Sequence, residues 1–244
     1  MNKIDVGLIV SAGKQKRFNS DIPKALVSID GNCLLDINIS ILEKVCNKVY
    51  VVCSIDNEKY FSDDKYNKIV IESGLGSGDA IYKSLISLNL KEGSIIISWG
   101  DSLLNEDLCY EILSKKNYST CIIPCVYESK PYVELIQRGC HLRVLFSKYN
   151  DKISPGYHDM SVFLCSIENL FASLSDFVNK FFDSNLKTYK HKHGNEFEFL
   201  DIFNDTDMVA SILEIDDSFK SYSFNSLSEL ETIIRRLHNE DKTD

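Results

Sequence analysis

Short apolar runs alternate with longer amphipathic stretches through the first half of this 244-residue chain, and this alternation restricts its fold most strongly. The apolar runs have the length of strands and occupy residues 6–10, 48–54, 67–72, 94–98 and 118–126. The intervening stretches carry apolar residues at helical spacing and occupy residues 34–45, 79–90 and 106–116. Strands that are apolar throughout and alternate with helices predict a mostly parallel sheet covered by helices on both faces.

The pattern changes after about residue 128, where strands follow one another without long helices between them. The expected strands of this second half occupy residues 132–137, 141–147 and 160–166. The expected helices occupy residues 167–182, 196–204 and 226–239. The sequence shows no repeat, low-complexity tract or linker-like segment. It therefore predicts a single α/β domain of Rossmann-like type, with a mixed, mostly parallel central sheet.

Composition excludes several classes of function. The chain is 44% hydrophobic and 26% charged, as expected for a globular protein with a core. A net charge of −9 argues against a nucleic-acid-binding protein with a broad basic face. No apolar run approaches the roughly 20 residues that cross a bilayer, so no membrane association is expected. The run at 6–10 is too short for a signal peptide, and the eight scattered cysteines are expected to be buried, reduced thiols of a cytoplasmic protein.

A basic loop follows the first expected strand of this acidic chain. Residues 11–24 read SAGKQKRFNSDIPK, with Asp21 as their only acid. In an open parallel sheet, ligands bind beyond the carboxyl ends of the strands, where this loop lies. Gly13 permits a tight turn, and the basic side chains that can bind phosphate oxygens are Lys14, Lys16, Arg17 and Lys24. The alternative is a solvated surface loop, and neither the P-loop nor the dinucleotide fingerprint is present.

The segment LIVSAGKQKRF…PKAL resembles the signature of the nucleotidyltransferases that make activated sugars and alcohols, such as MobA-like enzymes and the N-terminal domain of GlmU. Their signature is L-A-A-G-x-G-x-R-M followed by P-K. The matching residues are Ala12, Gly13, Arg17, Pro23 and Lys24, while Gln15 replaces the second glycine. The resemblance implies a catalytic role for Arg17 and Lys24 on the transferring phosphate and the pyrophosphate. It also implies nucleotide binding by Ser11, Ala12, Gly13, Lys14 and Lys16.

Four further segments match the family in the same order. Residues 74–85 resemble the segment that holds the base, with Gly74, Gly76, Ser77 and Gly78 as nucleotide-binding residues. Residues 95–104 resemble the strand that ends in Gly-Asp, which makes Asp101 a metal ligand, a nucleotide-binding residue and a catalytic residue. The segment 194–203 resembles the E-x-x-x-x-D helix through Glu196 and Asp201, and Asn225 matches the second metal ligand. The resemblance implies a nucleotide-binding half at 1–127 and an acceptor-binding half at 128–244.

The reaction implied by the resemblance is attack of an acceptor phosphate on the α-phosphorus of a nucleoside triphosphate, with release of pyrophosphate. A Mg²⁺ ion held by Asp101 and Asn225 is the expected cofactor, since Mg²⁺ prefers oxygen ligands. As alternatives, Asp101 and Asn225 are helix caps, and Glu196 and Asp201 support the structure. The sequence HKH at 191–193 offers a metal-binding pair, but we interpret it as an exposed polar loop.

The expected nucleotide is CTP, because the family's uracil-reading Gln is replaced by Gly74. The sugar-binding pattern is also changed, since Phe146 replaces a Glu, Asp159 an Asn and Ser161 a Gly. A small phosphorylated non-sugar acceptor is therefore expected, such as phosphocholine or the phosphoglutamine of capsule modification. Candidate acceptor-binding residues are Asp159, Glu196 and five basic residues that are alternatively surface residues, namely Lys130, Arg138, Arg143, Lys148 and His158. The alternatives are a sugar-1-phosphate uridylyl- or thymidylyltransferase and a non-catalytic nucleotide-binding regulatory domain.

Overall fold

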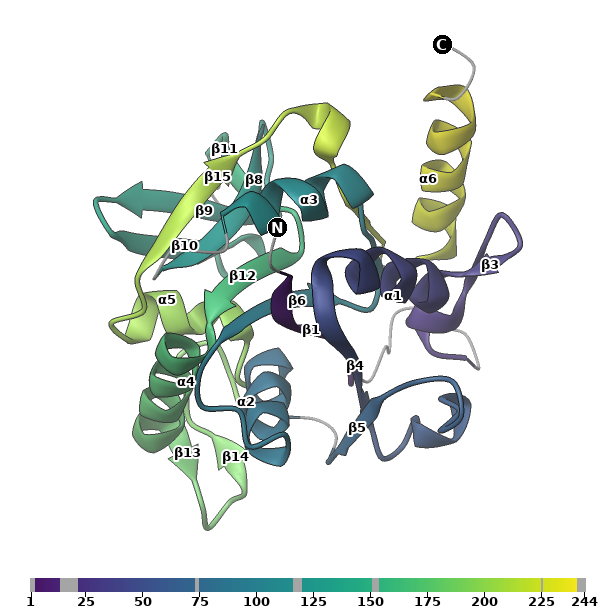
Figure 1. Ribbon diagram of the computed structural model, residues 1–244. Helices are drawn as coiled ribbons and strands as arrows, with labels where there is room; N and C mark the ends of the chain where they lie inside the picture. The colour runs from purple at the N-terminus through teal and green to yellow at the C-terminus, as the bar shows by residue number, and fades with distance from the viewer. Residues whose placement is uncertain are drawn as a thin grey trace.

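One ten-stranded sheet runs through the protein (Figure 1). The computed structural model describes residues 3–13, 22–72, 75–115, 120–150, 154–224 and 226–240. Across the sheet, the strands follow the order β10 (His141–Phe146), β9 (Val133–Arg138), β11 (Gly156–Asp159), β8 (Cys121–Glu128), β12 (Val162–Ser166), β6 (Ser94–Trp99), β1 (Ile4–Ser11), β4 (Cys46–Ser54) and β5 (Lys68–Ile71). The tenth strand, β15 (Ala210–Glu214), pairs with β8.

Three of the four parallel pairings among the described residues lie in the first half of the chain, and the fourth joins β15 to β8. Strand β1 is parallel to both β4 and β6, and β4 is parallel to β5. In this register Ser11 lies opposite Cys53, and Val10 lies opposite Trp99. The carboxyl ends of the parallel strands therefore meet at one edge of the sheet. In the second half, β12, β11, β9 and β10 add antiparallel pairings, as expected for strands without crossover helices.

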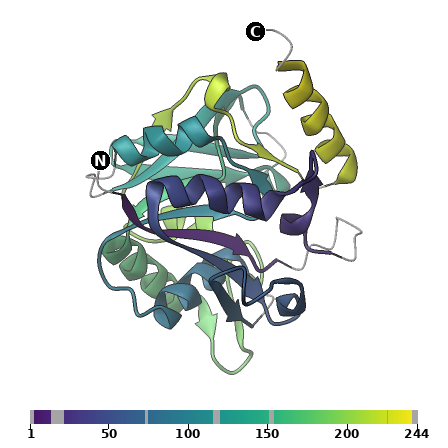
Figure 2. The same ribbon diagram turned by 45° about the vertical axis from the view of Figure 1, so that its right-hand side comes forward.

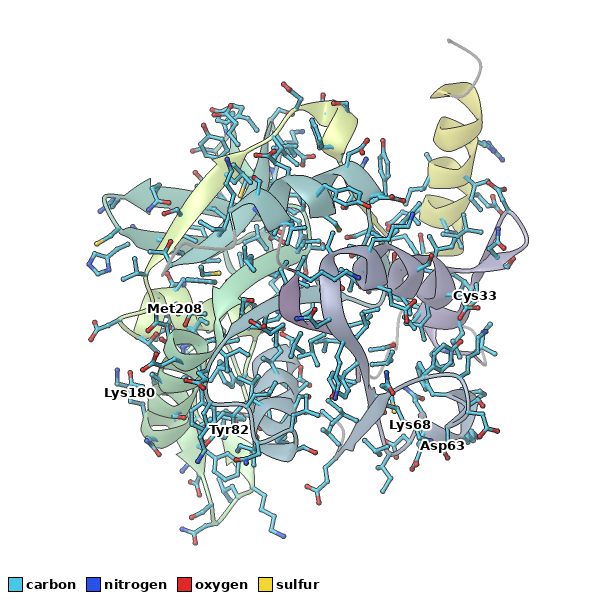
Figure 3. All side chains as sticks on the ribbon, in the orientation of Figure 1. Cys33, Asp63, Lys68, Tyr82, Lys180 and Met208 are labelled. Atoms are coloured by element: carbon cyan, nitrogen blue, oxygen red, sulfur yellow. The ribbon has the colours of Figure 1, made fainter. Side chains whose placement is uncertain are left out.

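Helices cover both faces of the sheet, as predicted (Figure 2). The first face carries α1 (Leu34–Val45) and α3 (Glu106–Ser114), and the second carries α2 (Ser77–Ser87) and α4 (Ile167–Phe181). Side chains of β1 point alternately to the two faces of the sheet. Leu8 packs into the core under α2 and α4, and Ile9 packs into the core under α1 and α3. On the second face, Tyr82 of α2 (labelled in Figure 3) stacks on Phe171 of α4 with ring centroids 5.7 Å apart.

Most predicted elements are confirmed, and α1 has the predicted bounds. The helix expected at 196–204 is wrong at its start, since the helical residues are a 3-10 turn, η4 (Phe199–Asp201), and α5 (Ile202–Asp205). Phe197 lies outside the helix, because its N–H donates to the Leu75 carbonyl at 2.8 Å and its carbonyl accepts from Gly78 N–H at 2.8 Å. The segment before Asp201 thus hydrogen-bonds to the residues at the start of α2 instead of forming a helix.

The C-terminal helix α6 (Leu227–Glu240) stands beside α1 and away from the central sheet (Figures 1 and 2). Six of the eight cysteines are buried and all eight are free, whereas Cys140 is exposed and Cys33 half-buried. Within the described ranges, no helix is both long enough and apolar enough to span a membrane.

Candidate active site

Lys24 and Asp101 meet at the carboxyl edge of the parallel strands. Lys24 lies in the 3-10 turn η1 (Lys24–Leu26), and Asp101 follows β6. The Lys24 Nζ donates to Asp101 Oδ2 at 3.2 Å. The Lys24 side chain is only 6% exposed, whereas that of Asp101 is 36% exposed. The pair therefore presents a carboxylate to solvent from a fixed position, with a buried ammonium group directly beside it.

Gly100 allows the turn that places Asp101. Its N–H donates to the Val10 carbonyl at 2.9 Å, which ties the end of β6 to the end of β1. A Cβ atom at Gly100 would lie 2.9 Å from the Cβ of Ser11 and 3.3 Å from that of Ala25. Any larger residue would push the two strand ends apart. The glycine of the Gly-Asp pair is thus required by backbone packing.

The late segment predicted to reach Asp101 does so. Strand β16 (Tyr222–Ser223) pairs antiparallel with β7 (Ser102–Leu103), immediately after Asp101. The Phe224 N–H donates to the Asp101 carbonyl at 3.4 Å, and Lys24 Nζ donates to the Phe224 carbonyl at 3.3 Å. Three distant parts of the sequence therefore converge. Asn225, the next residue, lies outside the described residues, as do Lys14, Lys16, Arg17 and Gly74, so their roles stay predictions.

Three serine hydroxyls lie in a row next to this junction. Ser223 Oγ is 2.7 Å from Ser102 Oγ and 2.9 Å from Ser161 Oγ. Ser161 has a φ of 60°, the left-handed region that favours glycine, which fits the family's glycine at this position. The Asp159 carboxylate stabilises this turn by accepting the Ser161 N–H at 2.9 Å. Asp159 is therefore held near the site, and one of its oxygens already has a structural partner.

Asn38 is a buried residue of the site that the sequence analysis missed. It lies in α1, and its Nδ2 donates to the Ser102 carbonyl at 2.7 Å. Its Oδ1 accepts the Leu104 N–H at 3.1 Å. Both contacts fix the strand that follows Asp101. The signal in the sequence was a single polar residue on the apolar face of an amphipathic helix, which required a partner when buried.

The glycines of the expected base-binding segment are required for packing. Gly76 has a φ of 98°, and a Cβ on it would lie 2.7 Å from the Phe197 backbone nitrogen. A Cβ on Gly78 would lie 2.6 Å from the Phe197 ring. Between them, the Ser77 hydroxyl accepts the Phe199 N–H at 2.9 Å and donates to Glu198 at 3.3 Å. The N-terminus of α2 is therefore fastened to the segment that precedes Asp201.

The remaining nucleotide-binding candidates lie at the end of β1. Ser11 and Ala12 are buried, whereas Gly13 is exposed. The Ser11 Oγ is buried and has no hydrogen-bond partner among the described residues. Ser11 lies next to Gly100, so this hydroxyl is close to the residue that precedes Asp101.

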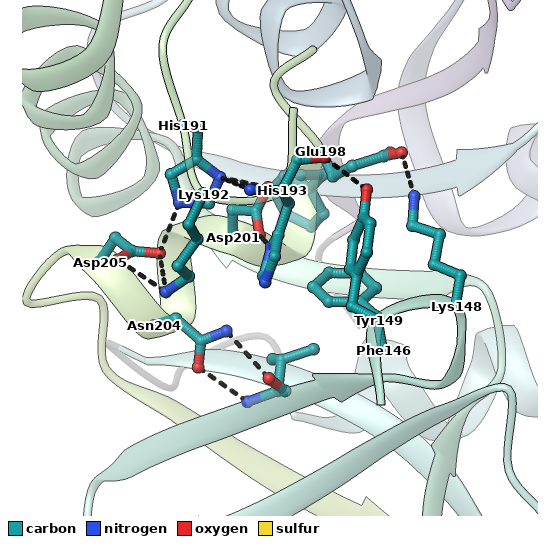
Figure 4. Close-up of polar contacts among 12 residues, drawn as sticks. Phe146, Lys148, Tyr149, His191, Lys192, His193, Glu198, Asp201, Asn204 and Asp205 are labelled. Atoms are coloured by element: carbon teal, nitrogen blue, oxygen red, sulfur yellow. Dashed lines mark hydrogen bonds and ion pairs between the residues drawn. The ribbon is translucent and has the colours of Figure 1, made fainter. Parts of the chain in front are cut away.

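Aromatic side chains surround Phe146, one of the positions where the sequence departs from the family's sugar-binding pattern. Phe146 is buried and contacts the Tyr149 and His193 rings, with centroids 6.0 and 5.2 Å away. Lys148 Nζ donates to Glu198 Oε1 at 2.9 Å on the same side (Figure 4). Glu196 is exposed. A buried Phe146 ring offers no hydrogen bond to a sugar hydroxyl, in agreement with the changed sugar pattern.

The other basic candidates are distributed toward the far strands. Lys130, Arg138 and Arg143 are exposed. Arg138 ends β9, which four strand spacings separate from β6 along the sheet order, or roughly 19 Å at about 4.8 Å per strand. The structure therefore does not bring Arg138 to Asp101. His158 is half-buried in β11 and its Nδ1 lies 3.3 Å from the Val133 carbonyl.

The interpretation of residues 191–193 as an exposed polar loop is wrong. The His191 side chain is only 1% exposed, because its ring packs against Phe177 and Phe181 of α4, with centroids 5.2 and 4.9 Å away. His193 stacks on Tyr149 at 4.5 Å. The ring nitrogens of both histidines lie close to the Asp201 carboxylate, which is fully buried. The sequence pattern alone did not show that aromatic side chains would cover this loop.

The chain matches a known family model. The model of the MobA-like NTP transferase domain matches residues 7–150. The bifunctional protein GlmU of Ruthia magnifica is 24% identical over 57% of this chain and 32% of its own length. A protein of Pyrococcus horikoshii assigned as a molybdenum cofactor guanylyltransferase is 29% identical over 68% of this chain and 83% of its own. The chain thus spans about a third of the first GlmU relatives that it matches.

Solved structures share the complete fold. The inositol-1-phosphate CTP transferase of T. maritima superposes with a TM-score of 0.68 and 17% identity over 99% of this chain and 98% of its own. A Bacillus anthracis protein assigned as a glucose-1-phosphate thymidylyltransferase superposes with a TM-score of 0.72 and 10% identity over 94% of each chain. The CTP:phosphocholine cytidylyltransferase of Streptococcus pneumoniae superposes with a TM-score of 0.66 and 15% identity over 96% of this chain and 100% of its own. At these identities the likeness establishes the fold.

Proposed function

Because this chain belongs to the MobA-like NTP transferase family, we propose that it transfers CMP from CTP to a small phosphorylated non-sugar acceptor and releases pyrophosphate. The observation that carries the proposal is the junction of Lys24, Asp101 and Phe224 at the carboxyl edge of the sheet. This is the edge at which open α/β sheets bind their ligands. Lys24 differs from an ordinary surface ion pair, because its side chain is buried and is held by both Asp101 and the Phe224 carbonyl.

The chain's own residues would act by neutralising charge and positioning the reactants. An acceptor phosphate oxygen forms a bond to the α-phosphorus, and the bond from that phosphorus to the bridging oxygen breaks, so that pyrophosphate leaves. Lys24, already held beside Asp101, would donate to the phosphate oxygens on which negative charge increases. Arg17 would do the same from the basic loop. The acceptor phosphate is anionic at neutral pH, so the reaction needs no general base.

The donor set at Asp101 fits Mg²⁺. Its carboxylate is partly exposed, and Oδ1 makes no hydrogen bond to a described residue, while Oδ2 accepts from Lys24. Asn225 would add an amide oxygen from the residue after Phe224. Mg²⁺ prefers such oxygen ligands, together with water and substrate phosphates, and when bound it would lower the charge of the triphosphate.

The choice of CTP rests on Gly74 in place of the uracil-reading Gln. Support comes from two proteins with this fold, the inositol-1-phosphate CTP transferase of T. maritima and the CTP:phosphocholine cytidylyltransferase of S. pneumoniae. The non-sugar acceptor is supported by Phe146, which is buried where the family has a Glu, and by Asp159, whose Oδ1 accepts the Ser161 N–H. Inositol phosphate and phosphocholine are the acceptors named for those two structures.

Capsule or other cell-surface modification is the process that would use such an activated alcohol or amide. The free thiols fit a reducing compartment, and we place the reaction in the cytoplasm, where nucleoside triphosphates are made. The second candidate is a sugar-1-phosphate thymidylyl- or uridylyltransferase, which the B. anthracis likeness favours. A non-catalytic nucleotide-binding domain would not need the buried Lys24 beside Asp101.

Pyrophosphate release tests the function. CTP, UTP, GTP and dTTP are each combined with phosphocholine, inositol 1-phosphate, a phosphorylated amino-acid amide or glucose 1-phosphate, in the presence of Mg²⁺. We expect the fastest release with CTP and a non-sugar acceptor. Fastest release with UTP or dTTP and glucose 1-phosphate would support the second candidate. Nucleotide binding by calorimetry without release from any pair would support the binding domain.

A further inference from the structure

A second cluster of ligand-type side chains lies apart from Lys24 and Asp101. It consists of His191 and His193, in the loop after β14 (Thr188–Tyr189), and Asp201 at the end of η4. Each residue offers one ligand atom, and these atoms all lie within 4.8 Å of one another. Figure 4 shows the two imidazole rings and the carboxylate turned toward one another. None of the roles proposed above involves this cluster.

The Asp201 carboxylate is incompletely paired. The side chain is 0% exposed, and Oδ1 lies 2.7 Å from His193 Nδ1. Oδ2 is buried and has no hydrogen-bond partner among the described residues. A buried carboxylate oxygen without a donor is costly, so the site favours a positively charged partner at Oδ2.

The hydrogen bonds of His191 define which of its nitrogens faces that oxygen. Nε2 lies 3.2 Å from Asp205 Oδ2, an acceptor, so Nε2 carries the proton. The lone pair of Nδ1 accepts the His193 backbone N–H in a long bond of 3.4 Å, which a bound ion would replace. The same Nδ1 lies 3.6 Å from Asp201 Oδ2. Two electron-pair donors thus face each other across a gap without a hydrogen between them.

We propose that His191, His193 and Asp201 form a binding site for one divalent transition-metal ion of the Zn²⁺ class. Two ligands about 2.1 Å from a tetrahedral ion lie roughly 3.4 Å apart, which matches the 3.6 Å between His191 Nδ1 and Asp201 Oδ2. At His193, the ion replaces the proton shared with Asp201. Two imidazole nitrogens and one carboxylate favour Zn²⁺ over the oxygen-seeking Mg²⁺.

The surroundings have the features of a built metal site. The outer nitrogen of His191 donates to Asp205, which orients the ring as such carboxylates do for metal-bound histidines. Asp205 is itself held by Lys192 Nζ at 3.1 and 3.2 Å. The His193 side chain is 15% exposed, which leaves an entry path for the ion. The ion would tie the 191–193 loop to η4, and so to the segment that packs under α2.

Metal titration of the tag-free protein tests the site. After treatment with a chelator, the protein is titrated with Zn²⁺ by calorimetry and with Co²⁺ by visible absorption. We expect one equivalent per chain, a tetrahedral Co²⁺ spectrum, and a Tm increase of about 5–10 °C when Zn²⁺ is at 100-fold its Kd. Failure of the wild-type chain to bind either ion saturably would overturn the proposal.

Variants assign the binding to these residues. His193→Ala should weaken Zn²⁺ binding by about 100-fold or more, and Asp205→Asn, which keeps the three ligands, by about 10-fold to 100-fold. His141→Ala removes an exposed histidine elsewhere and should leave binding unchanged. Asp101→Ala should still bind one equivalent of Zn²⁺ per chain, which distinguishes this site from the proposed active site. Wild-type affinity in both His193→Ala and Asp205→Asn would contradict the assignment.

Discussion

Lys24 Nζ lies 3.2 Å from Asp101 Oδ2, although 77 residues separate the two in the sequence. The parallel register brings the ends of β1 and β6 together, and the 3-10 turn after the basic loop returns Lys24 to the same point. This edge of the sheet therefore carries a positive and a negative group side by side, so that a single bound phosphate can contact the ammonium group while a metal ion contacts the carboxylate. The proposed transfer reaction depends on this pair.

Lys24→Ala should lower kcat by about 100-fold or more, because the phosphate oxygens lose a fixed donor in the transition state. The measurement is pyrophosphate release under saturating nucleotide. Lys44→Ala is the matched control, since Lys44 also pairs with a carboxylate, Glu106, at 2.7 Å but on the exposed surface. If Lys24→Ala changed KM alone, the lysine would serve in docking and not in the chemical step.

Asn38→Ala should destabilise the fold by about 1–3 kcal/mol, because it leaves the Ser102 carbonyl and Leu104 N–H without their buried partner. It should also lower kcat, since the strand after Asp101 loses its anchor. Urea unfolding and pyrophosphate release measure the two effects. Asn67→Ala, which removes one side-chain bond to the Val49 carbonyl, should leave kcat unchanged. Equal kcat losses in both variants would show that Asn38 does not position Asp101.

Gly76→Ala should impair nucleotide binding and stability together. The new methyl group would meet the Phe197 backbone, and the φ of 98° disfavours any side chain. Gly139→Ala is the control, because Gly139 also has a positive φ, of 62°, but open space around it. Calorimetry with CTP and thermal unfolding compare the two. Similar behaviour of both variants would show that strain, and not the contact with Phe197, explains the requirement for glycine.

The protein should lose stability in alkaline solution as buried thiols ionise on unfolding. Burial raises the pKa of Cys109 from 9.0 to about 12 and that of Cys53 from 9.0 to about 11. Above pH 9 the unfolded chain releases these protons while the native state retains them, so each thiol's contribution is present below pH 9 and decreases as pH rises toward 11–12. The loss approaches about 1.4 kcal/mol per pH unit for each thiol.

Urea unfolding between pH 8 and pH 10.5 measures this loss. Cys109→Ala should show a shallower decrease with pH than the wild type, whatever its stability at pH 8. Cys140→Ala is the control, because Cys140 is exposed. Parallel curves for Cys109→Ala and the wild type would contradict the role given to burial of this thiol.

The sequence predicted the parallel half of the fold well, because periodicity and strand length report burial directly. Helix α1 has the predicted bounds, and Asp101 follows β6, as the Gly-Asp match predicts. The sequence could not show that Phe197 would pair with Leu75, nor that Phe177 and Phe181 would bury His191. These contacts join distant segments, and local patterns carry no information about them. Asn38 was missed for the same reason.

The most direct test of the proposed reaction is pyrophosphate release from CTP by wild-type protein and by Asp101→Ala, with Mg²⁺ and the acceptor selected in the screen. Circular dichroism and Tm first establish that the variant is folded. The expected result is release by the wild type, with one CMP-acceptor product per pyrophosphate, and at least about 100-fold slower release by Asp101→Ala. Wild-type release by the folded variant would contradict the placement of the reaction at Asp101.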